Sequence, residues 1–311
     1  MTDTQRQATT ESDDVLAVPL RHPWRWASAL VLGLLFAWLA VELWNNQNID
    51  HATIGNYLFN SRILSGAVMT VFLTFAAMAV STVLGVLVAG MKLSANPVLS
   101  FLAWFYVWVF RGSPLLVQIV FWGYLGLLFS EIVFGVPMTD IVFLRANTNA
   151  LIPPLVAGLI ALTLNQTAYS AEIIRAGLLS VDSGQREAAY SLGMSPLRTF
   201  SKIVLPQAMR VIIPPMGNET ISMLKDTSLL SVIAVLELYT AATRIASQNL
   251  RQVELLLVIT IWYVVMTTAL SIPQHYLEKR FGRGTGAQDG ILDRTLSRAW
   301  SALRRRSDAR G

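Results

Sequence analysis

Five charged residues lie within stretches of the chain that are otherwise apolar, and their chemistry needs an explanation. They are Arg111, Glu172, Glu219, Lys225 and Asp226. A charge inside a hydrocarbon layer is costly, so it normally faces a polar cavity or a charged partner. These groups could bind the charged ends of a zwitterionic substrate. Alternatively, they could pair with one another, stabilise a contact between subunits or, for Arg111, cap a broken helix.

Spacing places these residues on helical faces. Glu219 and Asp226 are seven residues apart, and Ser222 and Lys225 are three apart, so the members of each pair lie on the same face of a helix. Lys225 and Asp226 are adjacent and cannot share a face. This helix could therefore present a polar stripe toward a transport path.

An earlier segment repeats the pattern. Asn165, Tyr169 and Glu172 stand at positions i, i+4 and i+7, which fall on one helical face. Two such helices could line one shared path. Arg175 follows three residues later and could be an ordinary anchor at the membrane interface.

The sequence offers few residues that could catalyse a reaction. The chain has no cysteine, which excludes thiolate nucleophiles, thiolate metal sites and disulfides. The histidines are His22, His51 and His275, all near or outside the ends of the apolar stretches, and the nucleophile-elbow pattern G-x-S-x-G does not occur. An intramembrane hydrolase is therefore disfavoured.

The composition is that of an integral membrane protein. Of 311 residues, 54% are hydrophobic and 14% are charged, too apolar for a soluble domain. Nine of the 24 Lys and Arg residues fall in the last 34 positions, so residues 281–311 are predicted to be a basic cytoplasmic tail, and no nucleic-acid partner is expected. Residues 1–25 are polar and lack the pattern of a signal peptide, which predicts a disordered cytoplasmic tail.

Long apolar intervals predict six membrane crossings, because about 20 apolar residues in a helix span a hydrocarbon core. The third is expected to be kinked or broken at Arg111-Gly112-Ser113-Pro114, since Pro114 removes a backbone donor. Pro153 and Pro154 would sit in the first turn of the fourth. The predicted crossings are 26–44, 63–91, 93–130, 146–171, 211–236 and 255–277.

The distribution of Lys and Arg orients these crossings. An even number of spans puts both termini on one side, and that side then carries 18 Lys and Arg residues. The opposite loops carry four, which are Arg62, Arg145, Arg244 and Arg251. Because cytoplasmic loops are enriched in positive charge, the termini and segment 172–210 are predicted to be cytoplasmic.

The cytoplasmic segment 185–206 predicts two short helices joined at a glycine. Gln185–Leu192 suits a helix, Gly193 suits its left-handed C-terminal cap, and Ser195-Pro196 suits the start of a second helix. Pro206 is expected to end that second helix. The small pair Ala188-Ala189 would let one face approach another surface, beside the charge of Glu187. From physics alone, the segment could also be an amphipathic loop lying on lipid headgroups.

The spacing within this segment resembles a known motif. Glu-Ala-Ala, three residues, Gly, nine residues and Ile-x-Leu-Pro is similar to the EAA loop of permease subunits of bacterial ABC importers. Arg111 to Gln118, Ala168 to Arg175, Pro214 to Asn218 and Leu224 to Leu229 resemble the branch that carries histidine, glutamine, arginine and glutamate. The resemblance covers about residues 62–280. The matching positions of the loop are Gln185, Glu187, Ala188, Ala189, Gly193, Ile203, Leu205 and Pro206.

The resemblance implies an all-α membrane bundle with a five-helix, MetI-like permease core at 62–280, to which this chain adds an N-terminal transmembrane helix at 26–44. It implies alternating access driven by a separate cytoplasmic ATPase that docks on 185–206 and binds ATP and Mg²⁺, because this chain has no G-x-x-x-x-G-K-[ST] loop and is expected to bind no cofactor. The candidate substrate path is Arg111, Gln118, Asn165, Tyr169, Glu172, Asn218, Glu219, Ser222, Lys225 and Asp226.

The resemblance also implies partners and a location. The partners are an extracytoplasmic amino-acid-binding protein and a second permease chain, identical or different. The expected location is the bacterial plasma membrane, with both termini cytoplasmic. The rival interpretation is an ATP-independent secondary transporter or channel, which would also use buried charges and broken helices but has no reason to keep the Glu-Ala-Ala spacing. The sequence leaves the transported amino acid open.

Overall fold

The computed structural model describes residues 23–135 and 142–281, so most of both predicted tails, 1–25 and 281–311, lies outside the described residues. The chain divides into two compact units, and the boundary in the sequence lies between Asp50 and His51. Helix α1 (Pro23–Trp44) is the helix of the first unit. The exposed apolar side chains of its span 27–44 suit contact with lipid on all sides, but its membrane crossing stays a prediction.

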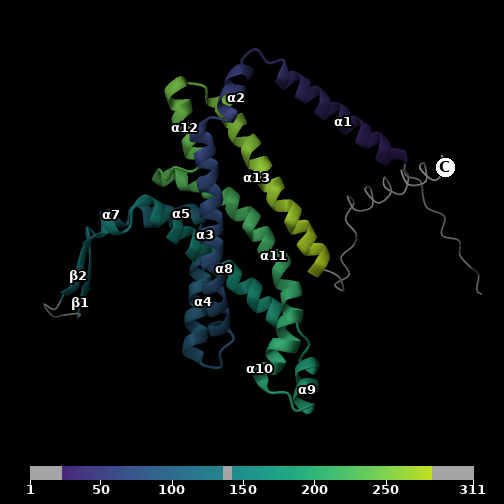
Figure 1. Cartoon of the computed structure of the whole chain (residues 1–311), viewed down its shortest axis with the longest axis vertical. Helices are drawn as coiled ribbons and strands as arrows, with labels where there is room; N and C mark the ends of the chain where they lie inside the picture. Colours follow the sequence, from purple (N-terminus) through teal and green to yellow (C-terminus); the bar gives the residue numbers. More distant parts are fainter. Residues whose placement is uncertain (1–22, 136–141, 282–311) are drawn as a thin grey trace, which may run out of the picture. The chain divides into compact units, whose positions relative to one another are not determined.

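The second unit is a helix bundle with one small β-ribbon (Figure 1). Helix α3 runs through its middle, and α8 and α11 pack beside it. The elements in chain order are α2 (His51–Leu58), α3 (Ser61–Lys92), α4 (Pro97–Gly112), α5 (Leu115–Gly123), α6 (Leu125–Leu128), β1 (Glu131–Gly135), β2 (Val142–Asn147), α7 (Thr148–Leu151), α8 (Pro154–Leu179), α9 (Ser183–Ser191), α10 (Pro196–Thr199), a π-helix (Phe200–Val204), α11 (Leu205–Asp226), a 3₁₀-helix (Thr227–Ile233), α12 (Leu238–Asn249) and α13 (Gln252–Phe281).

Three single helices in the described part of the chain are long and apolar enough to cross a membrane, namely α1, α3 and α13. Two bent pairs raise the number to five. One is α4 with α5, and the other joins the helical segment 196–233 to α12. Helix α8 is not among them because polar residues such as Asn165 and Gln166 lower its hydropathy, although its 26 residues are long enough to span.

The predicted break in the third crossing is confirmed. Helix α4 ends at Gly112, Pro114 lies at the N-cap of α5 in an extended conformation, and the two helices meet at 99°. Proline is unfavourable inside a helix and favourable at its start, so it fixes the bend here.

Two predicted helix boundaries were wrong. The fourth crossing does not begin at residue 146, because a hairpin strand and the short α7 precede the Pro153-Pro154 start of α8. Pro206 does not end a helix but lies in the first turn of α11. The π-turn before it, closed by Leu205 N–H donating to the carbonyl of Phe200, lets the chain pass the proline without a break.

The fifth crossing also differs from the prediction of 211–236. Helix α11 ends at Asp226, and the 3₁₀-helix after it stops at Ala234, whose φ of 59° is left-handed. Inside α11, Pro214-Pro215 is tolerated, and the side chain of Gln274 on α13 donates a 2.8 Å hydrogen bond to the carbonyl of Pro214. The side chain of a neighbouring helix thus adds a donor beside the two prolines.

A β-ribbon departs from the otherwise all-α architecture. Strands β1 and β2 pair antiparallel, with Glu131 opposite Asn147, in a segment that is predicted to be external and for which the sequence predicted no strand. The ribbon is exposed and includes an ion pair between Arg145 and Glu131 at 3.6 Å.

Small residues let α3 and α8 approach closely. A Cβ atom added at Gly85 of α3 would lie 2.7 Å from the Cβ of Ser170 and 3.2 Å from the backbone nitrogen of Ala171, both on α8. In a membrane the hydrophobic effect does not drive helices together, because lipid tails are as apolar as the helix surface. Close packing of helix backbones therefore provides much of the free energy of helix association.

We predict that Gly85→Ala destabilises the protein by about 1–3 kcal/mol, because the methyl group forces two helix backbones apart. The measurement is the midpoint of thermal unfolding in detergent. Gly90→Ala in the same helix is the matched control, since nothing lies within 4 Å of an added Cβ there. A Gly85→Ala protein that unfolds at the same temperature as Gly90→Ala would contradict this packing.

Candidate functional site

A polar cavity lies where the α4–α5 break meets α8 and α11. Its volume is about 430 Å³. Five of the residues proposed for the substrate path line it, and so does Gln166, which the sequence analysis did not single out. The charged and polar side chains around it are Arg111, Ser113, Asn165, Gln166, Tyr169, Glu219 and Asp226.

Two buried side-chain amides donate hydrogen bonds to backbone carbonyls at the helix break. The Nε2 of Gln118 donates to the carbonyls of Phe110 and Ser113 at 3.0 and 3.1 Å and to the Ser113 hydroxyl at 2.9 Å. The Nδ2 of Asn165 on α8 donates to the same Phe110 carbonyl at 3.0 Å and to the Oε1 of Gln118 at 3.3 Å. These bonds satisfy carbonyls that lose their helical partners at Pro114.

Arg111 points its guanidinium at an aromatic face. The guanidinium carbon lies 5.0 Å from the ring centroid of Tyr169 on α8, within cation–π range. Among the described residues it forms no ion pair, and Gln118 caps the break in its place. Arg111 therefore presents a cation to the cavity.

Two carboxylates face this cation from α11. Glu219 and Asp226 both line the cavity, as their spacing of seven residues requires. The Oε2 of Glu219 accepts a 3.2 Å hydrogen bond from the Nε2 of Gln166. With Glu219, Asp226 and Arg111 ionised, the wall carries two negative charges and one positive charge.

The other five proposed path residues do not line this cavity. Gln118 holds the break beside it, Glu172 lies in a second cavity, and the remaining three are Asn218, Ser222 and Lys225. Lys225 is adjacent to Asp226, so its side chain points to a different face of the helix. The Nδ2 of Asn218 donates to the Oε1 of Glu278 on α13 at 3.5 Å, away from the α4–α5 break. Their part in a substrate path stays a prediction.

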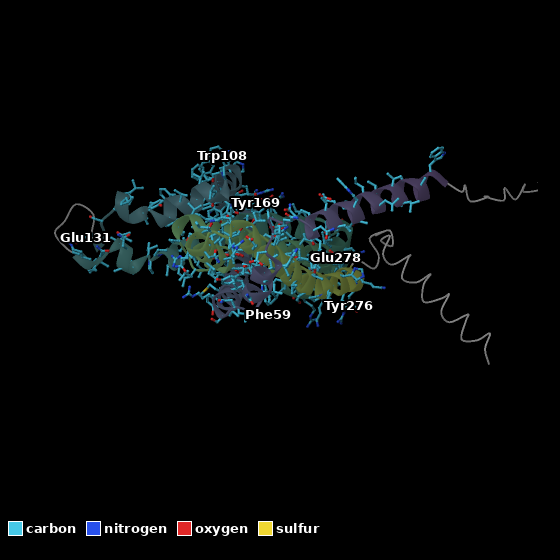
Figure 2. All side chains as sticks on the ribbon, turned by 90° about the horizontal axis from the view of Figure 1, so that it is seen from above. Phe59, Trp108, Glu131, Tyr169, Tyr276 and Glu278 are labelled. Carbon is cyan, nitrogen blue, oxygen red and sulfur yellow. The ribbon has the colours of Figure 1, made fainter. Side chains whose placement is uncertain are left out.

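A second cavity of about 410 Å³ adjoins the first. It shares Arg111, Gly112 and Tyr169 with the first cavity, so the Arg111–Tyr169 contact separates the two. Figure 2 shows Tyr169 and Trp108, both lining residues, on one side of the molecule. The stripe of positions 165, 169 and 172 thus runs from one cavity into the next.

Glu172 lies in this second cavity between two cations. It pairs with Lys92 at the end of α3 and accepts hydrogen bonds from the Nη2 and Nε of Arg175 at 3.0 and 3.2 Å. Its side chain is 18% exposed. Lys92 was counted only as a cytoplasmic charge from the sequence, because nothing in the spacing links residues 80 positions apart.

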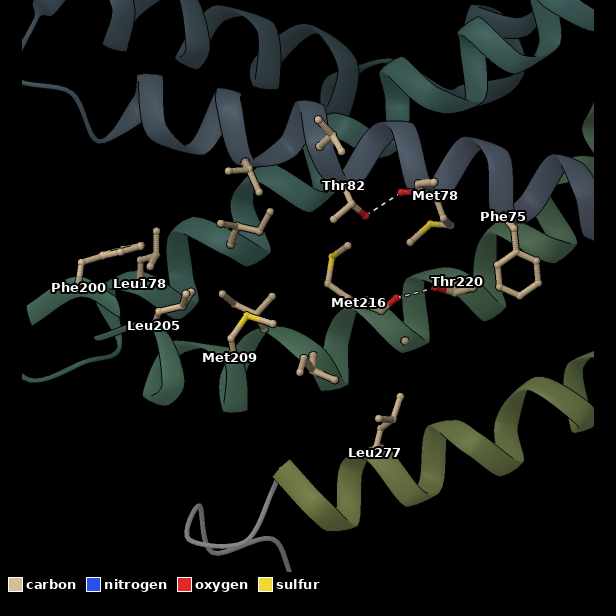
Figure 3. A pocket seen from close by; sticks show the side chains of 17 residues that line it. Phe75, Met78, Thr82, Leu178, Phe200, Leu205, Met209, Met216, Thr220 and Leu277 are labelled. Carbon is tan, nitrogen blue, oxygen red and sulfur yellow. Dashed lines mark hydrogen bonds between the residues drawn. The ribbon is translucent and has the colours of Figure 1, made fainter. Parts of the chain in front are cut away.

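A larger cavity elsewhere in the bundle does not suit a polar substrate. Its volume is about 690 Å³, and it lies among α3, α8, α11 and α13 (Figure 3). Methionine and other apolar side chains line it, and the hydroxyls of Thr82 and Thr220 donate to carbonyls of their own helices. Its lining suits hydrocarbon, and none of the proposed site residues lines it except Leu205, which belongs to the loop motif.

The predicted two-helix loop is present at one end of the bundle (Figure 1). Helix α9 starts after Asp182, whose carboxylate accepts a 2.7 Å bond from Gly184 N–H. Gly193 has a φ of 76°, and its N–H donates to the Tyr190 carbonyl at 2.9 Å while Met194 N–H donates to that of Ala189 at 3.0 Å. This is the Schellman pattern, so the predicted left-handed cap is confirmed.

The sequence predicted that Ala188 and Ala189 lie together on the exposed face of the loop, and only one of them does. Glu187 and Ala188 are exposed, but Ala189 is only 4% exposed, because neighbouring helical residues point about 100° apart. Leu192 and Leu197 are 83% and 78% exposed on either side of Gly193. These two exposed leucines at the tip of the loop were not singled out from the sequence.

Comparison with known proteins agrees with this geometry. Residues 81–283 match the family described as "Binding-protein-dependent transport system inner membrane component". The arginine transport system permease ArgU of Corynebacterium glutamicum is 44% identical over 279 residues, covering 89% of this chain and 86% of that protein. The L-cystine permease TcyB of Bacillus subtilis is 37% identical over 223 residues, covering 71% and 87%.

Solved structures are similar as well. A chain in a crystal structure of an amino acid ABC transporter with histidines is 36% identical, with a TM-score of 0.64, and covers 75% of this chain and 99% of that one. A chain of the inward-facing MetNI methionine transporter has a TM-score of 0.52 at 15% identity, covers 70% and 95%, and shows the fold alone.

We predict that Gly193→Pro abolishes ATP-coupled uptake while the chain still inserts in the membrane. Proline cannot adopt a φ of 76° and lacks the N–H that bonds to Tyr190, so the turn between α9 and α10 is lost. Uptake is measured in vesicles with the ATPase and binding protein present. Gly193→Asn is the control, because asparagine tolerates the left-handed region. Normal uptake by the proline variant would remove the coupling role of the loop.

Proposed function

This chain belongs to the family of binding-protein-dependent transport system inner membrane components, and on that premise we propose that the cavity at the α4–α5 break binds a cationic amino acid in transit. The chain is the membrane-spanning permease subunit of an ATP-driven importer of polar amino acids. It is a transport component and not an enzyme.

The observation that carries the proposal is the charge of the cavity wall. An amino acid brings one carboxylate and one ammonium group, which Arg111 and one of the acids Glu219 and Asp226 can complement. The second acid is then left for a positive side chain. Tyr169 adds an aromatic face, which attracts cations. Two similar proteins carry names that fit, the arginine permease and the transporter solved with histidines.

Coupling to ATP follows from the exposed loop. We propose that α9 and α10 dock on a cytoplasmic ATPase subunit, with Glu187, Ala188, Leu192 and Leu197 in the contact. ATP and Mg²⁺ bind to that subunit. A second permease chain completes the path, and alternating access opens it to each side in turn.

We also propose the orientation of the chain. The excess of Lys and Arg on the side of α9 and α10 supports a cytoplasmic location for this loop and for both termini. The chain is embedded in the membrane, and the proposed compartment is the bacterial plasma membrane.

We predict that Asp226→Asn and Glu219→Gln each reduce arginine uptake about tenfold or more, and glutamine uptake much less, because only the cationic side chain needs the second carboxylate. Uptake of arginine, histidine and glutamine is measured separately, in vesicles that also contain the ATPase and the binding protein. Glu278→Gln is the control, since this residue lies outside the cavity and glutamine keeps the oxygen that accepts from Gln274.

Two outcomes would contradict the proposal. Equal loss of arginine and glutamine uptake would assign the acids a structural role only. Uptake by the permease alone, with neither ATPase nor ATP, would make the chain a secondary transporter or channel.

A further inference from the structure

Among the residues that the structure describes, two of the four cations on the proposed outer side form no ion pair. Arg145 pairs with Glu131, and Arg251 Nη1 lies 3.4 Å from the Oε1 of Glu254. Arg62 on α3 and Arg244 on α12 form no ion pair with any of the residues that the structure describes. Lys and Arg are scarce on the outer side of membrane proteins, so two free guanidinium groups there need a reason.

These two arginines line the same cavity. It lies between the first turns of α3 and one face of α12 and has a volume of about 590 Å³. Ser61, Ser65 and Gln248 add neutral polar groups to its wall, and no carboxylate lines it. We refer to this cavity, with Arg62 and Arg244, as the α3–α12 socket. Among the described residues that line it, two carry a positive charge and none carries a negative one.

The socket rests on a rigid base. At Gly66 of α3 an added Cβ would lie 2.9 Å from the Cα of Leu238, so the backbones of α3 and α12 are in close contact. Leu238 N–H also donates to the hydroxyl of Thr70 at 3.2 Å. The two helices that carry the arginines are therefore held at a fixed separation.

A fully buried carboxylate strengthens this base. Glu237 is 0% exposed and accepts hydrogen bonds from the N–H groups of Tyr239 and Thr240 at 2.8 and 2.7 Å, which caps the start of α12. It also accepts a 3.2 Å bond from the Tyr263 hydroxyl on α13. Since the framework is fixed in advance, a ligand that enters the socket loses little free energy to ordering it.

We propose that the α3–α12 socket binds a carboxylate side chain on the surface of the extracytoplasmic amino-acid-binding protein. Three observations support this proposal: the two positive charges on the socket wall, the proposed outer position of both arginines and the dependence of this family on a binding protein. Arginine suits this task, because its planar fork pairs with a carboxylate through two parallel hydrogen bonds. The inference rests on the proposed function and its orientation.

The test measures the affinity between the permease–ATPase complex in nanodiscs and the binding protein that supports its uptake in vesicles. Arg62→Gln and Arg244→Gln should each weaken binding about tenfold, and the double variant more, because each single variant removes one of the two cations that face the carboxylate. Arg145→Gln is the control, since it removes an outer cation that already pairs with Glu131. Salt should weaken the wild-type complex and have less effect on the double variant.

A second measurement does not depend on affinity. Because the chain has no cysteine, Arg62→Cys and Arg244→Cys each introduce a single thiol. A membrane-impermeant maleimide should label it from outside, and the binding protein should slow this labelling. Labelling only from inside would overturn the orientation and the inference together.

The remaining outcomes separate this inference from the proposed function. Unchanged affinity in the double variant, with uptake still dependent on ATP and on Glu219, would overturn the socket alone. A loss of affinity seen with phosphatidylglycerol in the nanodisc but not with phosphatidylcholine alone would overturn it in favour of an anionic lipid headgroup. Absence of ATP-dependent uptake by the unmodified protein would overturn the proposed function instead.

Discussion

The rest of the structure depends on one constraint, which is that a backbone carbonyl inside a hydrocarbon layer needs a hydrogen-bond donor from the protein. The α4–α5 break meets this constraint with side chains. Gln118 and Asn165 donate to the carbonyls around Ser113 that the helix can no longer satisfy. The break then costs little, and the backbone can turn aside to leave a polar cavity at a depth where a continuous helix would fill the space.

The same constraint explains why α8 is less apolar than its neighbours. Its amides must reach both the break and the acid of α11, through Asn165 to Phe110 and through Gln166 to Glu219. A helix that carries these groups must be shielded from lipid, and the close approach of α3 at Gly85 provides that cover on one side. Low hydropathy in α8 thus follows from its position between the cavity and the core.

Features that depend on local geometry could be predicted from the sequence. The left-handed conformation of Gly193 follows from a glycine after a helical run, and the bend at Pro114 follows from the missing donor. The helical period placed positions 219 and 226 on one face, and both line the cavity. Each of these needs only neighbours a few residues away.

Features that depend on residues far apart in the chain could not be predicted from the sequence. The pairing of Lys92 with Glu172 joins two helices, and Glu237 lies just beyond the predicted end of an apolar stretch and was not singled out at all. Pro206 was misjudged for a related reason. In an α-helix the proline ring clashes with the carbonyl four residues before it, and the wider π-turn at 200–204 relieves that clash before Pro206.

That π-turn lies between the proposed docking loop and the cavity. From Pro196 to Asp226 the chain is helical without interruption, a rod of about 45 Å at 1.5 Å per residue. Glu219 and Asp226 lie near one end of the rod, and the exposed Leu197 lies near the other. If the loop docks as proposed, its displacement is passed to the acids of the cavity wall through this helix, unless the helix bends. Its weak points are the π-turn and Pro214-Pro215, and the hydrogen bond from Gln274 supports the second of these. The π-turn is then the place where movement of the loop can be absorbed or transmitted.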